Sequence, residues 1–207
     1  MRVIADSFGT EYAKSQIDKY VARFDRYLNL VTERVAKIPE GEKKTVLVIG
    51  SVDSPNVGPL DSYQGYWTNL TGLLNVSPVP NGEPNSTLTM EEIYNLDPDV
   101  IIAQGPFNRA AINADEQWKE VRAVQEGMLF SNPSVLDEWG MPTTEAPLQF
   151  IWVLKQFYPD YAVGIDATTE LIDFYKEFYE YEMSVEDAEA LLSCHHFYLH
   201  EALKDME

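Results

Sequence analysis

The sequence predicts an α/β fold: a three-layer lobe with a mainly parallel sheet flanked by helices, preceded by a long helix. Three observations predict it. Short, mainly apolar runs typical of strands covered on both faces occur at 45–50, 100–105 and 128–132. Helical patterns alternate with these runs, which favours parallel strand pairing. One long segment in which apolar residues have helical spacing precedes all of them.

The long helix is expected over residues 11–38. Its apolar positions recur at three- and four-residue steps, and "IPEGEKK" then ends it with proline and glycine. A helix of this length is too long to be covered by a small core, so we interpret it as an arm or spine. Its apolar positions are Ile17, Tyr20, Val21, Phe24, Tyr27, Leu28, Val31, Val35 and Ile38.

The first strand, "TVLVIG", is followed by "SVDSPNVGPLDSYQGYW", which is rich in turn formers and aromatic residues and predicts a long loop. Thr89 and Glu92 then form a capping box for a short helix, "MEEIYNL". "DPD" ends that helix, because proline disfavours helical geometry in the residue before it. "VIIAQG" is the second strand.

The remaining elements continue the alternation. "WKEVRAVQEGMLFSNP" predicts a short helix, a turn and the third strand, and "APLQFIWVLKQFYP" predicts an apolar helix between Pro147 and Pro159 in which Trp152 packs in the core. Residues 166–192 are predicted helical, with Ser184 and Asp187 as a looser capping box. The predicted strands end at Gly50, Gln104-Gly105 and Asn132-Pro133, and ligands of such sheets bind at the carboxyl ends of strands.

Composition limits the function classes. The chain has 207 residues, 45% of them hydrophobic, which indicates one folded domain or a domain with a helical arm. Its net charge of −19 repels nucleic-acid phosphate and opposes docking on anionic lipid, so no nucleic-acid partner is expected. No stretch approaches the length of a membrane span, so no membrane insertion is expected. The start lacks the apolar run of a signal peptide, so the chain as given has no export signal.

Several kinds of chemistry have no sequence support. There is no phosphate loop, dinucleotide fingerprint or nucleophile elbow, so no cofactor and no enzymatic activity are expected. The one cysteine, Cys194, allows no intrachain disulfide. It lies beside His195, His196 and His200, of which the last two would share a helix face. A metal site and an ordinary tail helix are the two readings of this segment.

Four motifs in order resemble the binding proteins of ABC importers for ferric siderophores, haem and cobalamin. "LTMEEIYNLDPDVIIAQG" resembles that family's S-x-E-x-I-x-x-L-x-P-D-V-I-I segment, and "WKEVRAVQEGMLFSNP" its W-x-x-x-x-A-V-x-x-G-x-V-Y segment. "EAPLQFIWVLKQFYPD" and "FYKEFYEYEMSVEDAEALL" are similar to its two C-terminal helical motifs. The family has two α/β lobes joined by a rigid helix, with the ligand between them.

The resemblance implies a domain organisation. Residues 1–10 would be the remnant of a missing N-terminal lobe, 11–39 the long spine helix, 44–193 the C-terminal α/β lobe and 194–207 a tail. If a leader and an N-terminal lobe are missing from this segment, the protein would work outside the cytoplasm, in the periplasm or at the cell surface. The implied function is non-catalytic capture of an iron complex, haem or corrinoid and its delivery to an ABC permease.

Aromatic and polar residues near the strand ends are the candidate ligand contacts. Aromatic rings stack on flat ligands, and the guanidinium of Arg109 suits an anionic group; for each residue the alternative is packing or a surface salt bridge. The candidate ligand-binding residues are Tyr63, Tyr66, Trp67, Phe107, Asn108, Arg109 and Trp139. By resemblance, Glu145, with Glu138 as second choice, would meet arginines of the permease; the alternative for Glu145 is a favourable helix-start charge.

Two other function classes stay open. A single lobe exposes the face that its partner lobe would cover, so it is a candidate protein-interaction or self-association module, including a homo-oligomer through that cleft face. An enzyme of the nitrogenase-like type uses the same fold, but one cysteine cannot supply cluster ligands.

Overall fold

The fold centres on a parallel sheet of four strands. The computed structural model describes residues 9–105, 107 and 109–193. The strands are β1 (Thr45–Ile49), β3 (Leu74–Asn75), β5 (Val100–Ala103) and β6 (Leu129–Ser131), in the order β3-β1-β5-β6. Every neighbouring pair is parallel, with Val46 opposite Val100 and Ile101 opposite Leu129. The predicted α/β class and the three predicted strands are confirmed.

Helices and a small two-stranded antiparallel sheet complete the regular structure of the described chain. The α-helices are α2 (Glu11–Val35), α3 (Tyr63–Leu70), α4 (Met90–Leu96), α5 (Arg109–Ala114), α6 (Arg122–Gln125), α7 (Ala146–Phe157), α8 (Ala167–Tyr179) and α9 (Val185–Leu192). Short 3-10 turns occupy Glu40–Glu42, Trp118–Glu120 and Pro159–Tyr161. Strands β2 (Asn56–Val57) and β4 (Ser86–Thr87) pair antiparallel, apart from the main sheet.

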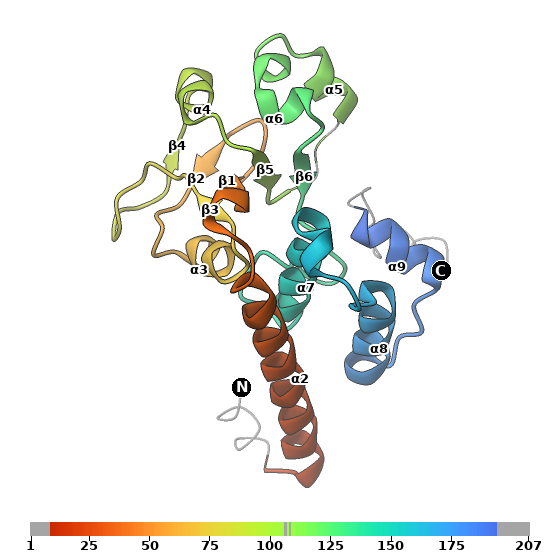
Figure 1. Cartoon of the computed structure of the whole chain (residues 1–207). Helices are drawn as coiled ribbons and strands as arrows, with labels where there is room; N and C mark the ends of the chain where they lie inside the picture. The colour runs from red at the N-terminus through yellow and green to blue at the C-terminus, as the bar shows by residue number, and fades with distance from the viewer. Residues whose placement is uncertain (1–8, 106, 108, 194–207) are drawn as a thin grey trace.

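Side chains of the central strands alternate between two apolar clusters, one on each face of the sheet. Val46, Val48 and Ile102 pack with residues of α2, α3, α7, α8 and α9. Leu47, Ile49 and Ile101 pack with residues of α4, α5 and α6. Figure 1 shows these two helical layers on opposite sides of the sheet, with α8 and α9 lying outside α7. Burial of both strand faces explains why these strands read as continuous apolar runs.

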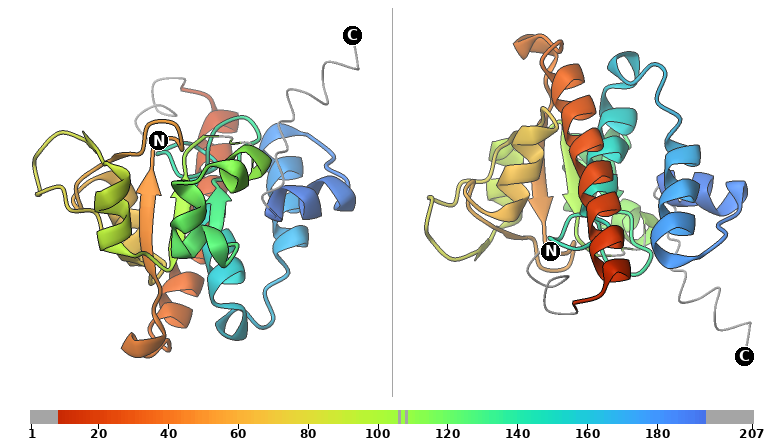
Figure 2. Two further views of the ribbon diagram at one scale, coloured as in Figure 1. Left: turned by 90° about the horizontal axis from the view of Figure 1, so that it is seen from above. Right: turned by 90° about the horizontal axis from the view of Figure 1, so that it is seen from below.

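The long helix α2 begins after Thr10, whose side chain accepts a hydrogen bond from the Ala13 backbone at 3.1 Å. It ends at Val35, three residues before the predicted end. Tyr27 and Val31 are its fully buried residues and belong to the cluster that contains α7. Figure 2 shows α2 lying along α7, with α3 on one side and α8 on the other. The helix therefore packs on the lobe as part of one layer.

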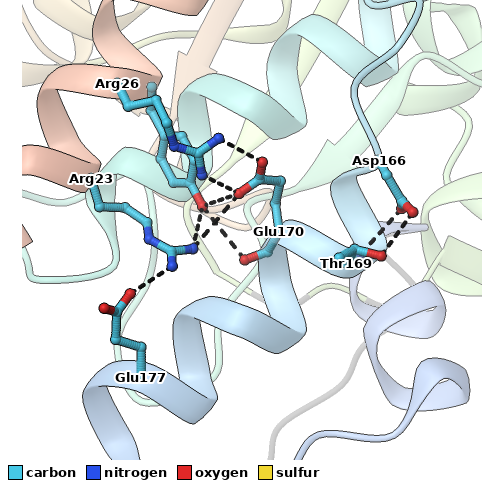
Figure 3. A network of polar contacts seen from close by, with 7 residues as sticks. Arg23, Arg26, Asp166, Thr169, Glu170 and Glu177 are labelled. Atoms are coloured by element: carbon cyan, nitrogen blue, oxygen red, sulfur yellow. Dashed lines mark hydrogen bonds and ion pairs between the residues drawn. The ribbon is translucent and has the colours of Figure 1, made fainter.

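A polar network joins α2 to α8 (Figure 3). Both terminal nitrogens of Arg26 donate to the Glu170 carboxylate, one of them at 2.8 Å, and the Tyr27 hydroxyl donates to the same carboxylate at 2.8 Å. Arg23 donates to Glu177 at 2.6 Å. Burial opposes the charged form of Glu170, but these hydrogen bonds outweigh it and hold the pKa of Glu170 below its usual value.

Capping explains several element boundaries. Thr89 and Glu92 form the predicted capping box of α4, with both reciprocal hydrogen bonds present. Ser184 caps α9 by accepting a hydrogen bond from the Asp187 backbone at 3.0 Å, but the helical stretch predicted over 166–192 is two helices. They are separated by residues 180–184, which begin at Glu180 with a positive φ of 54°. These caps show where local sequence signals determined the fold.

The predicted loop over residues 51–67 is wrong in its second half, where α3 begins. Ser62 caps this helix by accepting a hydrogen bond from the Gly65 backbone at 3.3 Å. The cap was hidden among turn formers such as Pro59 and Asp61. Of the described helices, none is both long enough and apolar enough to cross a membrane.

Candidate functional site

The carboxyl ends of β1, β5 and β6 lie side by side. The Gln104 backbone donates to the Ile49 carbonyl at 2.8 Å, and the Asn132 backbone donates to the Ala103 carbonyl at 2.9 Å. The ladder thus continues one residue beyond β5 and one residue beyond β6, and it places Gln104 and Asn132 at the same edge. This is the edge where open α/β sheets bind ligands. We call it the carboxyl edge.

Residues 132–145, the edge loop, connect β6 to α7 at this edge. The Trp139 backbone donates to the Pro133 carbonyl at 3.0 Å. The Glu145 carboxyl group reaches back and accepts hydrogen bonds from the backbones of Leu136 and Asp137, each at 3.3 Å. The last residue of the loop therefore fastens its middle.

Two amides position the carboxyl group of Glu138. Gln149 of α7 donates to the Asn132 side-chain oxygen at 2.9 Å, and the Asn132 amide donates to Glu138 at 2.9 Å. Gln149 is fully buried and Asn132 is nearly so. A Cβ atom at Gly140 would lie 2.1 Å from the Asn132 amide nitrogen, so the loop requires glycine there. We call this arrangement the amide relay.

The two glutamates of the edge loop have strongly raised pKa values. Burial raises the pKa of Glu138 to about 7, against the opposing hydrogen bond from Asn132. Burial likewise raises the pKa of Glu145 to about 7, although the backbone groups of Asp137 and Leu136 favour its charged form. Among the ion pairs of the described residues, none includes either glutamate. Both carboxyl groups are therefore poised between neutral and charged forms near neutral pH.

The loop also exposes apolar surface. Leu136 is 55% exposed and Met141 is 41% exposed. The Gln104 amide donates to the Met141 sulfur at 3.4 Å, which joins the second strand end to the loop. An amide, a thioether, an aliphatic side chain and a carboxyl group are thus available for non-covalent contacts with a small molecule. The described residues contain no cluster of three histidine, cysteine or acidic side chains arranged to hold a metal ion.

The predicted aromatic contacts after β1 lie on α3, not on a loop. Tyr63 packs against the core, and burial raises its pKa to about 12. Tyr66 is 50% exposed, with its ring centroid 6.1 Å from that of Tyr63. Trp67 has no exposed surface. In this structure the packing alternative describes Trp67, and Tyr66 has the most exposed side chain of the three.

Of the predicted contacts after β5, Phe107 belongs to the opposite face of the sheet. Phe107 is partly buried against the cluster that includes α4, α5 and α6. Arg109 opens α5, and its side chain, like the whole of Asn108, lies outside the described part of the structure. The tail with Cys194 and the three histidines also lies outside it. The predicted residues are therefore distributed over both faces of the sheet.

The edge loop corrects two further interpretations. Trp139 has no exposed surface and belongs to the core, so here too the packing alternative describes it. Glu145 is fully buried, so it presents no carboxylate to a permease in this conformation. Glu138 is partly exposed. Trp152 is 1% exposed, as the core-packing prediction requires.

Sequence reasoning located the strand ends but missed the side chains that organise them. Gln149 is the one polar residue in the run "APLQFIWVL" and lies at a position that faces the core. A polar residue at such a position indicates a buried side chain with hydrogen-bond partners, so this residue could have been found from the sequence. Met141 and Leu136 gave no signal, because their exposure depends on how the edge loop folds.

Comparisons with known proteins agree with this architecture. A family model described as periplasmic binding protein matches residues 1–136. The molybdate-binding protein MolA of Haemophilus influenzae is 26% identical over 131 residues, which are 61% of this chain and 37% of MolA.

Solved structures show the same fold. An ABC transporter solute-binding protein from Sulfurospirillum deleyianum superposes with a TM-score of 0.77 at 22% identity, over 88% of this chain and 57% of that one. Molybdate-bound MolA gives 0.70 at 22% identity, over 84% and 53%. Helicobacter pylori CeuE in a Ni-His complex gives 0.65 at 16% identity, over 79% and 52%.

The chain spans about half the length of these structures and less of the MolA sequence. At such identities the structural likeness establishes the fold, whereas the family model covers well over half of the chain. The parallel sheet, its two helical layers and this match together show that the chain belongs to the periplasmic binding protein family.

Proposed function

We propose that this chain supplies one ligand-binding lobe and the adjoining long helix of a substrate-binding protein of an ABC importer. It captures a small molecule non-covalently at the carboxyl edge and delivers it to a permease outside the cytoplasm, with no bond made or broken. The observation that carries the proposal is the meeting of three strand ends beside one loop, in a family fold. Helix α2 then corresponds to the spine that precedes this lobe.

The proposed ligand is a compact metal-containing solute: an iron complex, haem or a corrinoid. Leu136 and Met141 offer apolar area to a flat ring or a ligand shell, and Gln104 and Glu138 offer hydrogen bonds at its border. The names of relatives mention other metal-containing solutes, molybdate for MolA and Ni-His for CeuE. Molybdate and nickel–histidine are therefore included in the binding test.

The test is a separate titration of the chain with each of five ligands: a ferric siderophore, haem, cobalamin, molybdate and nickel–histidine. Binding is measured by calorimetry and by tryptophan fluorescence. One class should bind saturably at one site. Met141→Ala and Gln104→Ala should weaken that binding by about five-fold or more, since each removes a contact at the edge. The matched control is Val163→Ala, which is 69% exposed after α7 and should leave the affinity unchanged. Absence of binding by every ligand would refute the proposal for this chain.

We propose that Glu138, rather than Glu145, contacts the permease, because Glu138 is partly exposed and Glu145 is fully buried. In vesicles that contain the permease and the ligand-loaded protein, Glu138→Gln should lower ATP hydrolysis. Asp137→Asn, an exposed carboxylate on the same loop, is the control. Equal activity of the two variants would remove Glu138 from the interface.

A self-association module is the second candidate, and the exposure of Leu136 and Met141 at the carboxyl edge favours it. Two lobes joined through this edge would cover the apolar surface of both. Sedimentation at increasing protein concentration should then show a dimer that Leu136→Glu abolishes. A monomer at every concentration would exclude this function.

A further inference from the structure

The edge loop holds one fully buried carboxyl group, that of Glu145, and one partly buried carboxyl group, that of Glu138, and neither has a cationic partner among the described ion pairs. Glu145 has no exposed surface, and its hydrogen-bond donors are the uncharged backbones of Leu136 and Asp137. Glu138 receives a hydrogen bond from the uncharged Asn132 amide. A buried carboxylate with neutral partners alone is costly, whereas a protonated carboxyl group is tolerated.

No cationic group that faces Glu145 lowers this cost. The Asp137 carboxylate of the same loop raises the pKa of Glu145, whereas the hydroxyl of Tyr175 on α8 favours the charged form and Tyr179 of α8 is uncharged. Around Glu138, the contacts from β6 and α7 are the neutral amides of Asn132 and Gln149. Ionisation therefore finds no compensating positive charge among the described neighbours on either side of the loop.

The same two groups fasten the loop at different points. Glu145 joins the start of α7 to the middle of the loop, and Glu138 joins the loop to the strand end through the amide relay. Ionisation strengthens the hydrogen bonds from these N–H donors, but desolvation is the larger effect on both groups. A charged Glu145 or Glu138 therefore gains free energy by moving toward water, and such a movement releases the fastening that each provides. Leu136 and Met141 are carried by the segment that would move.

We propose that the edge loop is a proton-controlled element of the ligand-binding face: it is closed when Glu138 and Glu145 carry their protons, and it opens when they ionise. The inference rests on the proposed function only in assigning this edge to ligand binding. Acidification would fix Leu136 and Met141 in one arrangement, and alkaline conditions would free them. Proton uptake would thus regulate the shape of the edge that meets the solute.

The test follows Trp139, which is enclosed in the loop, by fluorine NMR of the whole chain labelled with 5-fluorotryptophan. The Trp139 signal, assigned with Trp139→Phe, should change with a midpoint near pH 7, the pKa of both glutamates. The signal of Trp67 on α3 should stay constant. The change should disappear in the double variant Glu138→Gln/Glu145→Gln. It should persist in Asp137→Asn with a lower midpoint, because that variant removes a charge that raises the pKa of Glu145.

A Trp139 signal that is constant between about pH 5.5 and 8.5, or a change that survives the double variant, would overturn the proposal. If the double variant fails to fold, the single variants decide: each should remove one part of the change, with folding checked by the other tryptophan signals. No ligand is present in this experiment. Its outcome is therefore independent of the ligand titrations that test the proposed function.

Discussion

At the scale of single residues, Gly140 determines whether the amide relay can form. A Cβ atom there would lie 2.1 Å from the Asn132 amide nitrogen, and Asn132 cannot turn away without losing its bonds to Gln149 and Glu138. Gly140→Ala should therefore lower the free energy of unfolding by about 1–3 kcal/mol. Urea denaturation measures this. Gly41→Ala is the control, because a Cβ atom at Gly41 meets nothing within 4 Å, and an equal loss in both variants would contradict the explanation.

The burial of Glu145 predicts a pH-dependent stability. Its folded-state pKa of about 7 lies above its usual value of 4.5, so the folded state binds more protons between these values and stability falls as pH rises through that range. Glu145→Gln removes this dependence. Compared with the natural chain, it should be more stable by about 1–3 kcal/mol at pH 8, and the difference should shrink at pH 5.

Thermal and urea denaturation at the two pH values provide the measurement for Glu145→Gln. The control is Glu33→Gln, because Glu33 is an exposed carboxylate on α2 and does not belong to the edge loop. A constant difference between Glu145→Gln and the natural chain at both pH values would show that hydrogen bonding, rather than charge burial, determines the effect.

Individual residues also show where prediction from sequence ends. Trp67 and Trp139 follow strands in aromatic, polar surroundings, which suit a ligand contact and a packed core equally well, and both are enclosed. Glu145 is read from sequence as a helix-start carboxylate. Its burial results from the edge loop, which covers it through the backbones of Leu136 and Asp137. Sequence periodicity contains no information about such loop contacts.

At the scale of elements, the junction of α2 and α8 depends on one carboxylate. Glu170 binds Arg26 and Tyr27 and lies 3.7 Å from Arg23, and its side chain is 21% exposed (Figure 3). Glu170→Ala leaves these donors without their partner and should lower the free energy of unfolding by about 1–3 kcal/mol at pH 7. The pKa of Glu170 is depressed, so this stabilisation is lost as pH falls through that pKa.

Chemical denaturation at neutral and acidic pH tests the Glu170 prediction. The control is Glu11→Ala, which breaks an exposed ion pair between Glu11 and Lys14, both on α2. It should leave the free energy of unfolding unchanged. If Glu170→Ala lowers the free energy of unfolding by the same amount at neutral and acidic pH, the effect comes from lost packing and not from the lost charge.

Elements with strong local signals were predictable. The strands β1, β5 and β6 are apolar because the sheet is covered on both faces, and α4 has its capping box in the sequence. Strand β3 is two residues long with a partly exposed burial pattern, so no apolar run marks it. The start of helix α3 was missed because its cap stands among turn formers, and its packing against the cluster that contains residues of α2 and α7 is a tertiary effect.

At the scale of the whole molecule, the charge imbalance predicts the effect of salt on stability. The chain has 34 acidic and 15 basic residues, and mutual repulsion of the excess carboxylates opposes compaction. Salt screens this repulsion, but it also weakens the local ion pairs, most of which are on the surface and contribute little. Repulsion should dominate, so the stability should rise with ionic strength.

Raising sodium chloride from about 20 mM to about 300 mM shortens the screening length from beyond 20 Å to below 10 Å. We expect this to stabilise the fold by about 1 kcal/mol, a rise of roughly 2–4 °C in the melting temperature of a chain of this size. Calorimetry in sodium chloride and in potassium chloride measures it. Equal rises in the two salts would indicate general screening, a rise in one alone would indicate specific ion binding, and a fall in both would show that the ion pairs between α2 and α8 outweigh the repulsion.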